Sequence, residues 1–141
     1  MNPLALEQQV CFPLYAASRA VTAAYRPLLA PLGLTYPQYL VLLVLWEHGT
    51  RSVRELGEAL HLDSGTLSPL LKRMEASGLI ERRRGTDDER QVNVDLTADG
   101  LALRERAVEV PQQLHAATGI DAETLAQLAR ACKAILEEAE R

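Results

Sequence analysis

The chain has 141 residues, of which 48% are hydrophobic and 24% charged, and its formal net charge is −4. This is the composition of one globular domain. The longest apolar or aromatic run, 39–46, is too short to cross a bilayer, and the first residues lack the features of a signal peptide, so we expect a cytoplasmic protein. Two widely separated cysteines form neither a disulfide framework nor a zinc-binding spacing.

The charges are unevenly distributed. Between Lys72 and Arg84 there are five basic and two acidic residues, so this window carries +3 and the rest of the chain −7. An acidic net charge alone argues against a nucleic-acid partner. The local basic window is nevertheless compatible with DNA binding through one surface.

The first half of the chain predicts two long helices. The first begins at Pro13, which suits a first helical turn because its missing N–H would be unpaired there anyway, and extends to about Ala30. Thr35 starts the second, with Gln38 as its capping-box partner. Its run 39–46 is almost wholly apolar, so we expect burial on all sides.

The middle of the chain predicts two shorter helices joined by a tight turn at 62–65. Ser52 and Glu55 form another capping box that opens a helix to about residue 60. The next helix extends from about 64 to 77 and is closed by a glycine. Its apolar positions recur at spacings of three and four, which predicts one buried face: Leu67, Leu70, Leu71 and Met74.

The period then changes to that of a strand. Residues 79–84 and 91–96 read as two strands joined by the hairpin loop 85–89. Two short helices followed by a basic hairpin are the outline of a winged helix-turn-helix.

Helices follow the hairpin to the end of the chain. Thr97 can cap a long helix to about Leu114, bent or interrupted near Pro111, and a last helix extends over 122–140. The helices at the two ends of the chain exceed what a winged helix needs. Their apolar faces need a partner surface, and a symmetric dimer would supply it.

The helix that begins near residue 64 has the side chains of a DNA reader. Recognition helices present their N-terminal residues to bases, and hydroxyls and basic groups to phosphates. The alternative is that the hydroxyls only cap the helix and the basic residues form a solvated face. The candidate DNA contacts here are Ser64, Thr66, Ser68, Lys72 and Arg73.

The hairpin adds a second basic feature. Arg82, Arg83 and Arg84 precede its loop, and Arg90 follows it. An arginine at a hairpin tip can enter a minor groove, where a narrow A·T-rich stretch has the strongest negative potential. Asp88 could hold Arg90 by a charge-assisted pair. The alternative is a solvated charged loop.

These motifs resemble a known family. The segment DSGTLSPLLKRME at 63–75, followed by Gly78-Leu79-Ile80 and Asp88-Glu89-Arg90, resembles the MarR family of dimeric winged-helix repressors. The start, Cys11-Phe12-Pro13-Leu14-Tyr15 with Tyr25 and Tyr36, resembles its organic-hydroperoxide-sensing branch, the OhrR repressors. The resemblance covers nearly the whole chain.

The resemblance implies a mainly α fold with a small β-hairpin wing, in a single domain over 1–141. Residues 1–34 and 98–141 would form dimerisation helices, and 35–97 the winged helix-turn-helix that binds a pseudo-palindromic operator in double-stranded DNA. Organic hydroperoxide would oxidise Cys11, and the repressor would then release its operator. No enzyme activity, metal, cofactor or membrane is implied; His48, His61 and His115 lie on separate predicted elements.

Cys11 has a physical argument of its own. It lies near a helix N-terminus, where unpaired N–H groups and the positive end of the macrodipole favour a thiolate. Tyr15 and Tyr25 follow it by four and fourteen residues and project close to its direction at 100° per residue. Tyr25 is too far along the axis to reach Cys11 of its own helix. If Tyr25 acts on a thiolate, that thiolate should belong to the partner subunit, as the resemblance also implies, and Tyr36 would join it there. The alternative for Cys11 is an inert buried thiol.

Cys132 has a different setting. It shares a spacing with Leu125, Leu128 and Ile135, which predicts a core position on the last helix. Some members of the branch use a second, resolving cysteine, but 112–120, where we would expect it, has none. The resemblance therefore favours a one-cysteine mechanism in which a sulfenic acid condenses with a small cellular thiol.

Three other functions remain open from the sequence. The first is a MarR-type repressor released by a reversible phenolic ligand, with Cys11 incidental. The second is a thiol peroxidase, although no resolving partner or base near the thiol is visible. The third is a protein-binding wing module with no DNA partner.

Overall fold

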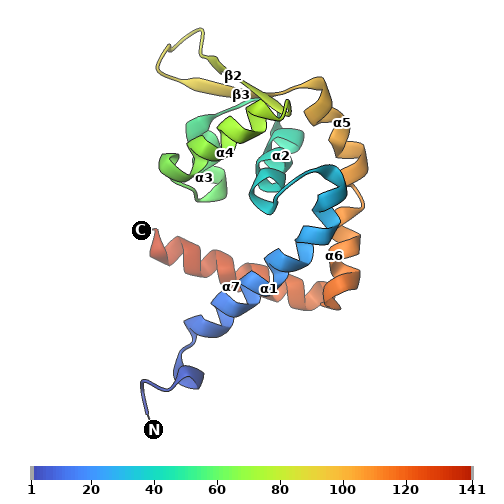
Figure 1. Cartoon of the computed structure of the whole chain (residues 1–141). Helices are drawn as coiled ribbons and strands as arrows, with labels where there is room; N and C mark the ends of the chain where they lie inside the picture. Colours follow the sequence, from blue (N-terminus) through green and yellow to red (C-terminus); the bar gives the residue numbers. More distant parts are fainter. Residues whose placement is uncertain (1, 141) are drawn as a thin grey trace. The chain divides into compact units, whose positions relative to one another are not determined.

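The computed structural model describes residues 2–140, which divide into two compact units: Tyr25–Glu109, and Met1–Ala24 together with Val110–Arg141. The chain is mainly helical with one small antiparallel sheet, which confirms the expected fold class (Figure 1). In chain order the elements are η1 Leu6–Gln8, α1 Cys11–Leu29, η2 Ala30–Leu32, α2 Tyr36–His48, β1 Arg51–Ser52, α3 Val53–Leu60, α4 Ser64–Ala76, β2 Ile80–Arg84, β3 Val92–Leu96, α5 Ala98–Ala107, α6 Val110–Thr118 and α7 Ala122–Ala139.

The first two helices follow the prediction with two differences. α1 begins at Cys11 rather than Pro13, so the cysteine is its first helical residue. α2 has the predicted capping box: the backbone N–H of Gln38 donates to Thr35 Oγ1, and Gln38 Oε1 accepts from the Thr35 N–H. The prediction that α2 is buried on all sides is wrong, because α3, α4 and α5 cover only part of it and Leu43 remains 39% exposed.

α3 and α4 form the helix-turn-helix of the second unit. Ser52 caps α3 through the predicted reciprocal bonds with Glu55, at 3.1 and 2.9 Å. His61 ends α3 in the left-handed region, with φ 56°, and Asp63 caps α4 by accepting from the Thr66 N–H. The predicted apolar face of α4 is confirmed, with each of its four members at most 4% exposed.

The sheet has one more strand than predicted. β2 and β3 form the expected hairpin, in register from Ile80 opposite Leu96 to Arg84 opposite Val92. The two-residue strand β1 pairs with the other edge of β3, so the order is β1-β3-β2. Two residues carry no periodicity, so sequence patterning could not detect β1.

The predicted helix from Thr97 to Leu114 is two helices. Thr97 caps α5 as expected, because its Oγ1 accepts from the Gly100 N–H at 3.1 Å. α5 ends at Ala107, and α6 begins at Val110. A continuous helix would press the ring of Pro111 against the carbonyl four residues earlier, that of Ala107, so the break lies where the proline demands it.

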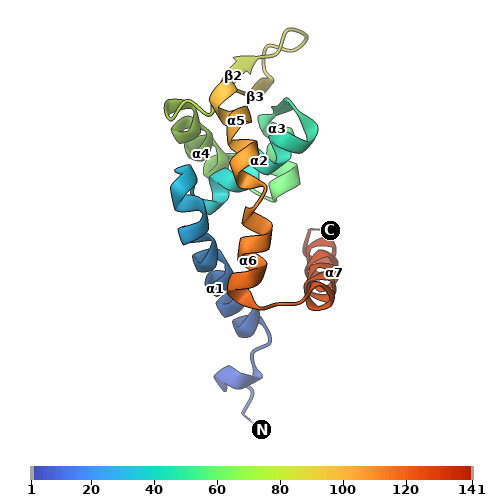
Figure 2. The ribbon, with the colours of Figure 1, turned by 90° about the vertical axis from the view of Figure 1, so that its right-hand side faces the viewer.

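α7 buries no residue in the described part of the chain. Figure 2 views α7 nearly along its axis. In this view α7 is separated from the first turns of α1 and from α6, the other α-helices of its unit. The predicted core position of Cys132 is therefore not reached within one chain: Cys132 is partly exposed, and Leu125, Leu128 and Ile135 are 40–52% exposed.

Within residues 2–140, no single helix is long and apolar enough to cross a membrane. The segments Cys11–Leu32 and Tyr36–His48 meet that criterion only together, as a pair bent by 70°. The second of these segments is α2, whose most buried side chains belong to the core of the second unit: Gln38, Tyr39, Val41, Leu42 and Leu45.

Candidate functional site

The outward face of α4 carries the predicted DNA contacts. The apolar residues of α4 face the core, and the remaining positions face solvent. The N-cap of α4 is Asp63, whose pKa is lowered mainly by the hydrogen bond from the Thr66 backbone. Capping by the helix hydroxyls therefore does not explain their presence. The exposed polar residues on α4 are Ser64, Thr66, Ser68, Lys72 and Arg73.

Arg82 connects the wing to α4. Glu75 of α4 accepts from the Arg82 backbone N–H at 3.0 Å and from its guanidinium at 3.1 Å. These bonds lower the pKa of Glu75, with the backbone bond the largest cause. The Arg82 side chain is 31% exposed, against 67% for Arg83, which pairs with Glu81 at 2.8 Å.

The wing tip is organised by its own charged groups. Arg84 Nη1 donates to the Glu89 carbonyl at 2.9 Å. The predicted pair is present: the backbone N–H and Nε of Arg90 donate to Asp88 Oδ1 at 3.0 and 3.5 Å. The Arg90 side chain is 94% exposed, so its guanidinium remains available to a ligand.

A hollow of about 600 Å³ lies between the N-terminal part of α3, α4 and the wing. Ser68, Arg82 and Arg90 line it, so the structure brings together residues that the sequence assigned to two separate motifs. Arg54, which the sequence analysis did not select, also lines it and is 89% exposed. Arg54 is the second residue of α3, two positions after the Ser52 cap, and this position was the available signal.

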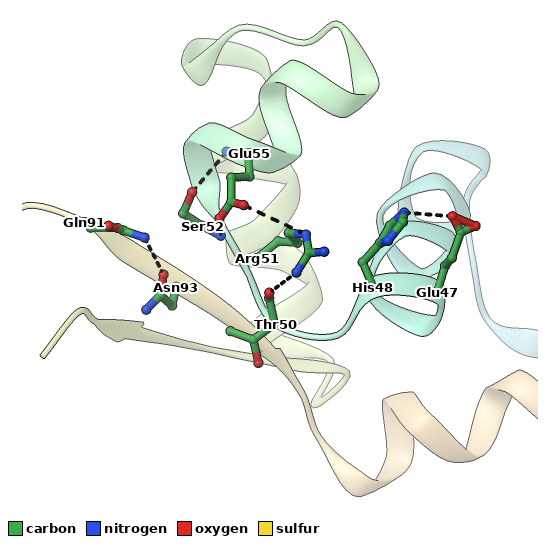
Figure 3. A network of polar contacts seen from close by, with 8 residues as sticks. All are labelled: Glu47, His48, Thr50, Arg51, Ser52, Glu55, Gln91 and Asn93. Carbon is green, nitrogen blue, oxygen red and sulfur yellow. Dashed lines mark hydrogen bonds and ion pairs between the residues drawn. The ribbon is translucent and has the colours of Figure 1, made fainter. Parts of the chain in front are cut away.

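A polar network fixes α3 to the sheet near this hollow (Figure 3). Arg51 Nη1 donates to the Thr50 carbonyl at 2.8 Å, and its Nε lies 3.9 Å from Glu55 Oε2. Gln91, the residue before β3, donates its Nε2–H to Oδ1 of Asn93 on β3 at 3.1 Å. The pKa of Glu55 is lowered, first by the hydrogen bond from the Ser52 backbone. The network thus joins the α3 cap to β1.

Cys11 and Tyr15 lie on the first turns of α1. Cys11 is a free, exposed thiol at the first helical position. Tyr15 is 60% exposed, and the guanidinium carbon of Arg19 lies 5.5 Å from its ring centroid. Within the described chain Cys11 is therefore not the inert buried thiol that the sequence left open as an alternative.

The tyrosines of the second unit form a cluster. The rings of Tyr25 and Tyr36 have centroids 4.6 Å apart, and Tyr39 lies 5.7 and 6.4 Å from them. Tyr39, which the sequence analysis did not select, is the third ring of the cluster. Burial raises the pKa of all three phenols, that of Tyr25 to about 12. The three hydroxyls thus remain protonated hydrogen-bond donors at neutral pH.

The phenolate titration of Tyr25 is a testable consequence. Its folded pKa of about 12 lies above the ordinary tyrosine value of 10.0, first through burial and then through Tyr36 and Tyr39. The stability that the neutral phenol contributes is therefore complete below pH 10 and is lost as pH rises toward 12. We expect ultraviolet absorbance to show a late phenolate phase that Tyr25→Phe removes. If Tyr15→Phe removes it instead, the assignment is wrong.

The fold and these sites define a winged-helix DNA-binding regulator. The family model described as transcriptional regulator SarA/Rot matches residues 23–107. The organic hydroperoxide resistance transcriptional regulator of Bacillus subtilis is 53% identical over 132 residues, covering 94% of this chain and 90% of that protein. The chain belongs to the MarR family of winged-helix transcriptional regulators, in its organic-hydroperoxide-sensing branch.

Solved structures agree with this assignment. Reduced AbfR of Staphylococcus epidermidis bound to DNA has a TM-score of 0.81 and 33% identity, over 96% of this chain and 95% of that one. The structures of overoxidized AbfR bound to DNA and of disulfide-formed AbfR match this chain with TM-scores of 0.77 and 0.65. AbsC, a MarR family transcriptional regulator from Streptomyces coelicolor, has a TM-score of 0.82 and 25% identity, covering 99% of both chains.

Proposed function

We propose that this chain is a homodimeric, cytoplasmic repressor that binds a pseudo-palindromic operator and releases it when an organic hydroperoxide oxidises Cys11. The observation that carries the proposal is the free, exposed Cys11 thiol at the first residue of α1 in a winged-helix chain. The similarity to the Bacillus subtilis regulator of organic hydroperoxide resistance supports the same chemistry.

DNA is bound by α4 and the wing. The exposed hydroxyls and basic groups of α4 contact bases and phosphates in a major groove, and Arg90 enters the adjacent minor groove, held by Asp88. Arg84 supports the loop through the Glu89 carbonyl, and Arg82 contributes mainly by holding β2 against Glu75.

The dimer is formed by the helices at the two chain ends, residues 1–34 and 98–141, around the DNA-binding part 35–97. The uncovered apolar face of α7 supports this assignment, since Leu125, Leu128 and Ile135 are each at least 40% exposed in one chain. Their burial on a second copy is favourable by roughly 25 cal/mol per Å² of apolar surface.

Oxidation begins with the Cys11 thiolate. Its sulfur attacks the terminal oxygen of the hydroperoxide, the O–O bond breaks, and the alkoxide leaves and takes up a proton to become an alcohol. The sulfur is oxidised by two electrons to a sulfenic acid. A small cellular thiol then attacks the sulfenic sulfur, so that a mixed disulfide forms and water leaves. Cys132 takes no part.

The phenols hold the thiolate before it reacts. Tyr15 lies one turn from Cys11 on the same helix, and Tyr25 and Tyr36 donate to the thiolate of the partner subunit. Once the sulfur carries an oxygen or a second thiol it no longer fits as their acceptor, and the DNA-binding parts of the dimer change their spacing. A tenfold loss of affinity requires about 1.4 kcal/mol.

The test is a duplex titration with DNA from upstream of the chain's own gene, before and after a stoichiometric dose of cumene hydroperoxide with a small thiol. We expect the wild type and Cys132→Ser to release the duplex on oxidation and Cys11→Ser to retain it. Release by Cys11→Ser would instead favour the reversible-ligand alternative.

The salt dependence of duplex binding distinguishes the repressor from a protein-binding wing module. A repressor that contacts phosphates loses affinity steeply with salt, whereas a protein-binding wing shows no salt-dependent duplex binding. We expect the first result for the reduced wild type.

A further inference from the structure

The tyrosine cluster continues along α2 to the only tryptophan of the chain. Tyr39 contacts Tyr25, Tyr36 and also Trp46, whose ring centroid lies 6.5 Å away in an edge-on arrangement. Trp46 follows Tyr39 by seven residues, two helical turns, so both rings lie on one face of α2. Tyr39 is 3% exposed and is the ring that joins the phenol pair to the indole.

Trp46 is in turn bonded to the start of α5. Its Nε1 donates to the Gly100 carbonyl at 2.9 Å, between residues 54 positions apart in the chain. This bond satisfies the only polar atom of the indole. It also fixes the end of α2 against the first turn of α5.

The first turn of α5 is attached to the junction between α4 and the wing. Thr97 Oγ1 donates to the Gly78 carbonyl at 2.6 Å, and the Thr97 N–H to the Leu79 carbonyl at 3.1 Å. A Cβ on Gly100 would overlap the Leu79 carbonyl oxygen, so the two backbones are in direct contact. Gly78 and Leu79 are the last two of the three residues between α4 and β2.

We propose that Tyr39 and Trp46 are positioning residues that transmit a change in the Tyr25–Tyr36 pair to the α4–β2 junction, through the Trp46–Gly100 hydrogen bond. The inference rests on the proposed function, because the event that displaces the phenol pair is the modification of Cys11. We call this series of contacts, from the Tyr25–Tyr36 pair to the α4–β2 junction, the link. All of its contacts lie within the Tyr25–Glu109 unit. Tyr39 is buried and the other three rings are half-buried against it. Packed rings and a hydrogen-bonded backbone transmit small displacements because such packing has few intermediate arrangements.

The variants Trp46→Phe and Tyr39→Leu interrupt the link at two points, and Tyr39→Phe keeps the ring as the matched control. Each is oxidised with cumene hydroperoxide and a small thiol, while loss of the Cys11 thiol and duplex affinity are measured. We expect unchanged thiol loss, but a ratio of reduced to oxidised affinity about tenfold smaller in both interrupting variants, a size common for mutations between coupled sites. Tyr39→Phe should keep the wild-type ratio. Wild-type ratios in Trp46→Phe and Tyr39→Leu would overturn the inference.

A second measurement separates this inference from the sensor proposal. If Cys11→Ser still releases DNA, the sensor assignment fails, and the link is judged from the emission of Trp46 in that variant, which Cys11 chemistry cannot alter. Coupling is reciprocal, so duplex binding should shift the Trp46 emission, and Tyr39→Leu introduced into Cys11→Ser should reduce the shift. An emission spectrum that DNA leaves unchanged would overturn the link.

Discussion

Replacing Arg90 by alanine is expected to weaken operator binding by about 10- to 100-fold in the dimer, because one guanidinium is lost from each of two wings. The Arg90 side chain is 94% exposed, and Asp88 accepts hydrogen bonds from the Arg90 backbone N–H and Nε. Asp88 therefore orients the guanidinium, while most of its surface stays accessible to a DNA groove. The log–log salt slope should also fall in magnitude by about 2, since two phosphate-region charges are removed.

The measurement is a duplex titration at several salt concentrations, with Arg104→Ala of α5 as the matched control for the loss of one exposed positive charge. The control should bind within about twofold of wild type. Asp88→Asn should show a smaller loss than Arg90→Ala, because it removes only the negative charge beside Arg90 and keeps the guanidinium. Equal binding by wild type and Arg90→Ala would show that the wing tip does not contact DNA.

Gly100→Ala is expected to destabilise the chain by roughly 2 kcal/mol or more, although alanine is the better helix former by about 1 kcal/mol. The new Cβ would overlap the Leu79 carbonyl oxygen and lie 3.1 Å from the Leu79 carbonyl carbon. A backbone group cannot rotate away as a side chain can. The helix must therefore move, with strain on the Trp46 and Thr97 bonds.

Denaturant unfolding followed by circular dichroism measures this effect. Gly65→Ala is the matched control: it is also helical, but its Cβ would meet only Asp63 Oδ1 at 3.4 Å. The control should stay within about 1 kcal/mol of wild type. A Gly100→Ala chain as stable as that control would mean that α5 can shift from Leu79 without cost.

Local chemistry made much of this fold predictable. The capping boxes at Thr35 and Ser52 and the apolar face of α4 are short-range patterns, and each has the predicted structure. Pro111 marked the interruption of the predicted long helix, but the actual boundary lies earlier, because the ring acts on the carbonyl four residues before it. The partial exposure of α2 depends on which helices cover it, and its own pattern contains no such information.

In the candidate site, too, the residues of local motifs were predicted and those that depend on long-range contacts were not. Cys11, Tyr25 and Tyr36 were selected from a motif, and the structure brings the two tyrosines into contact. Tyr39 and Trp46 were missed, because one contacts a ring on another helix and the other a carbonyl 54 positions away. Arg54 was missed because the α3 N-terminus approaches the wing only through β1, a strand of two residues. Contacts between residues far apart in the chain produce no periodic pattern in the sequence.

The bare apolar face of α7 makes protein concentration a variable of this regulator. An isolated helix of 18 residues that buries none of its side chains is only marginally stable in water. In the proposed dimer, the order of this helix and the association of two chains are one equilibrium, so the apparent melting temperature rises with concentration. The abundance of the chain in the cell would then set both the number of repressors and the fraction of chains able to act as one.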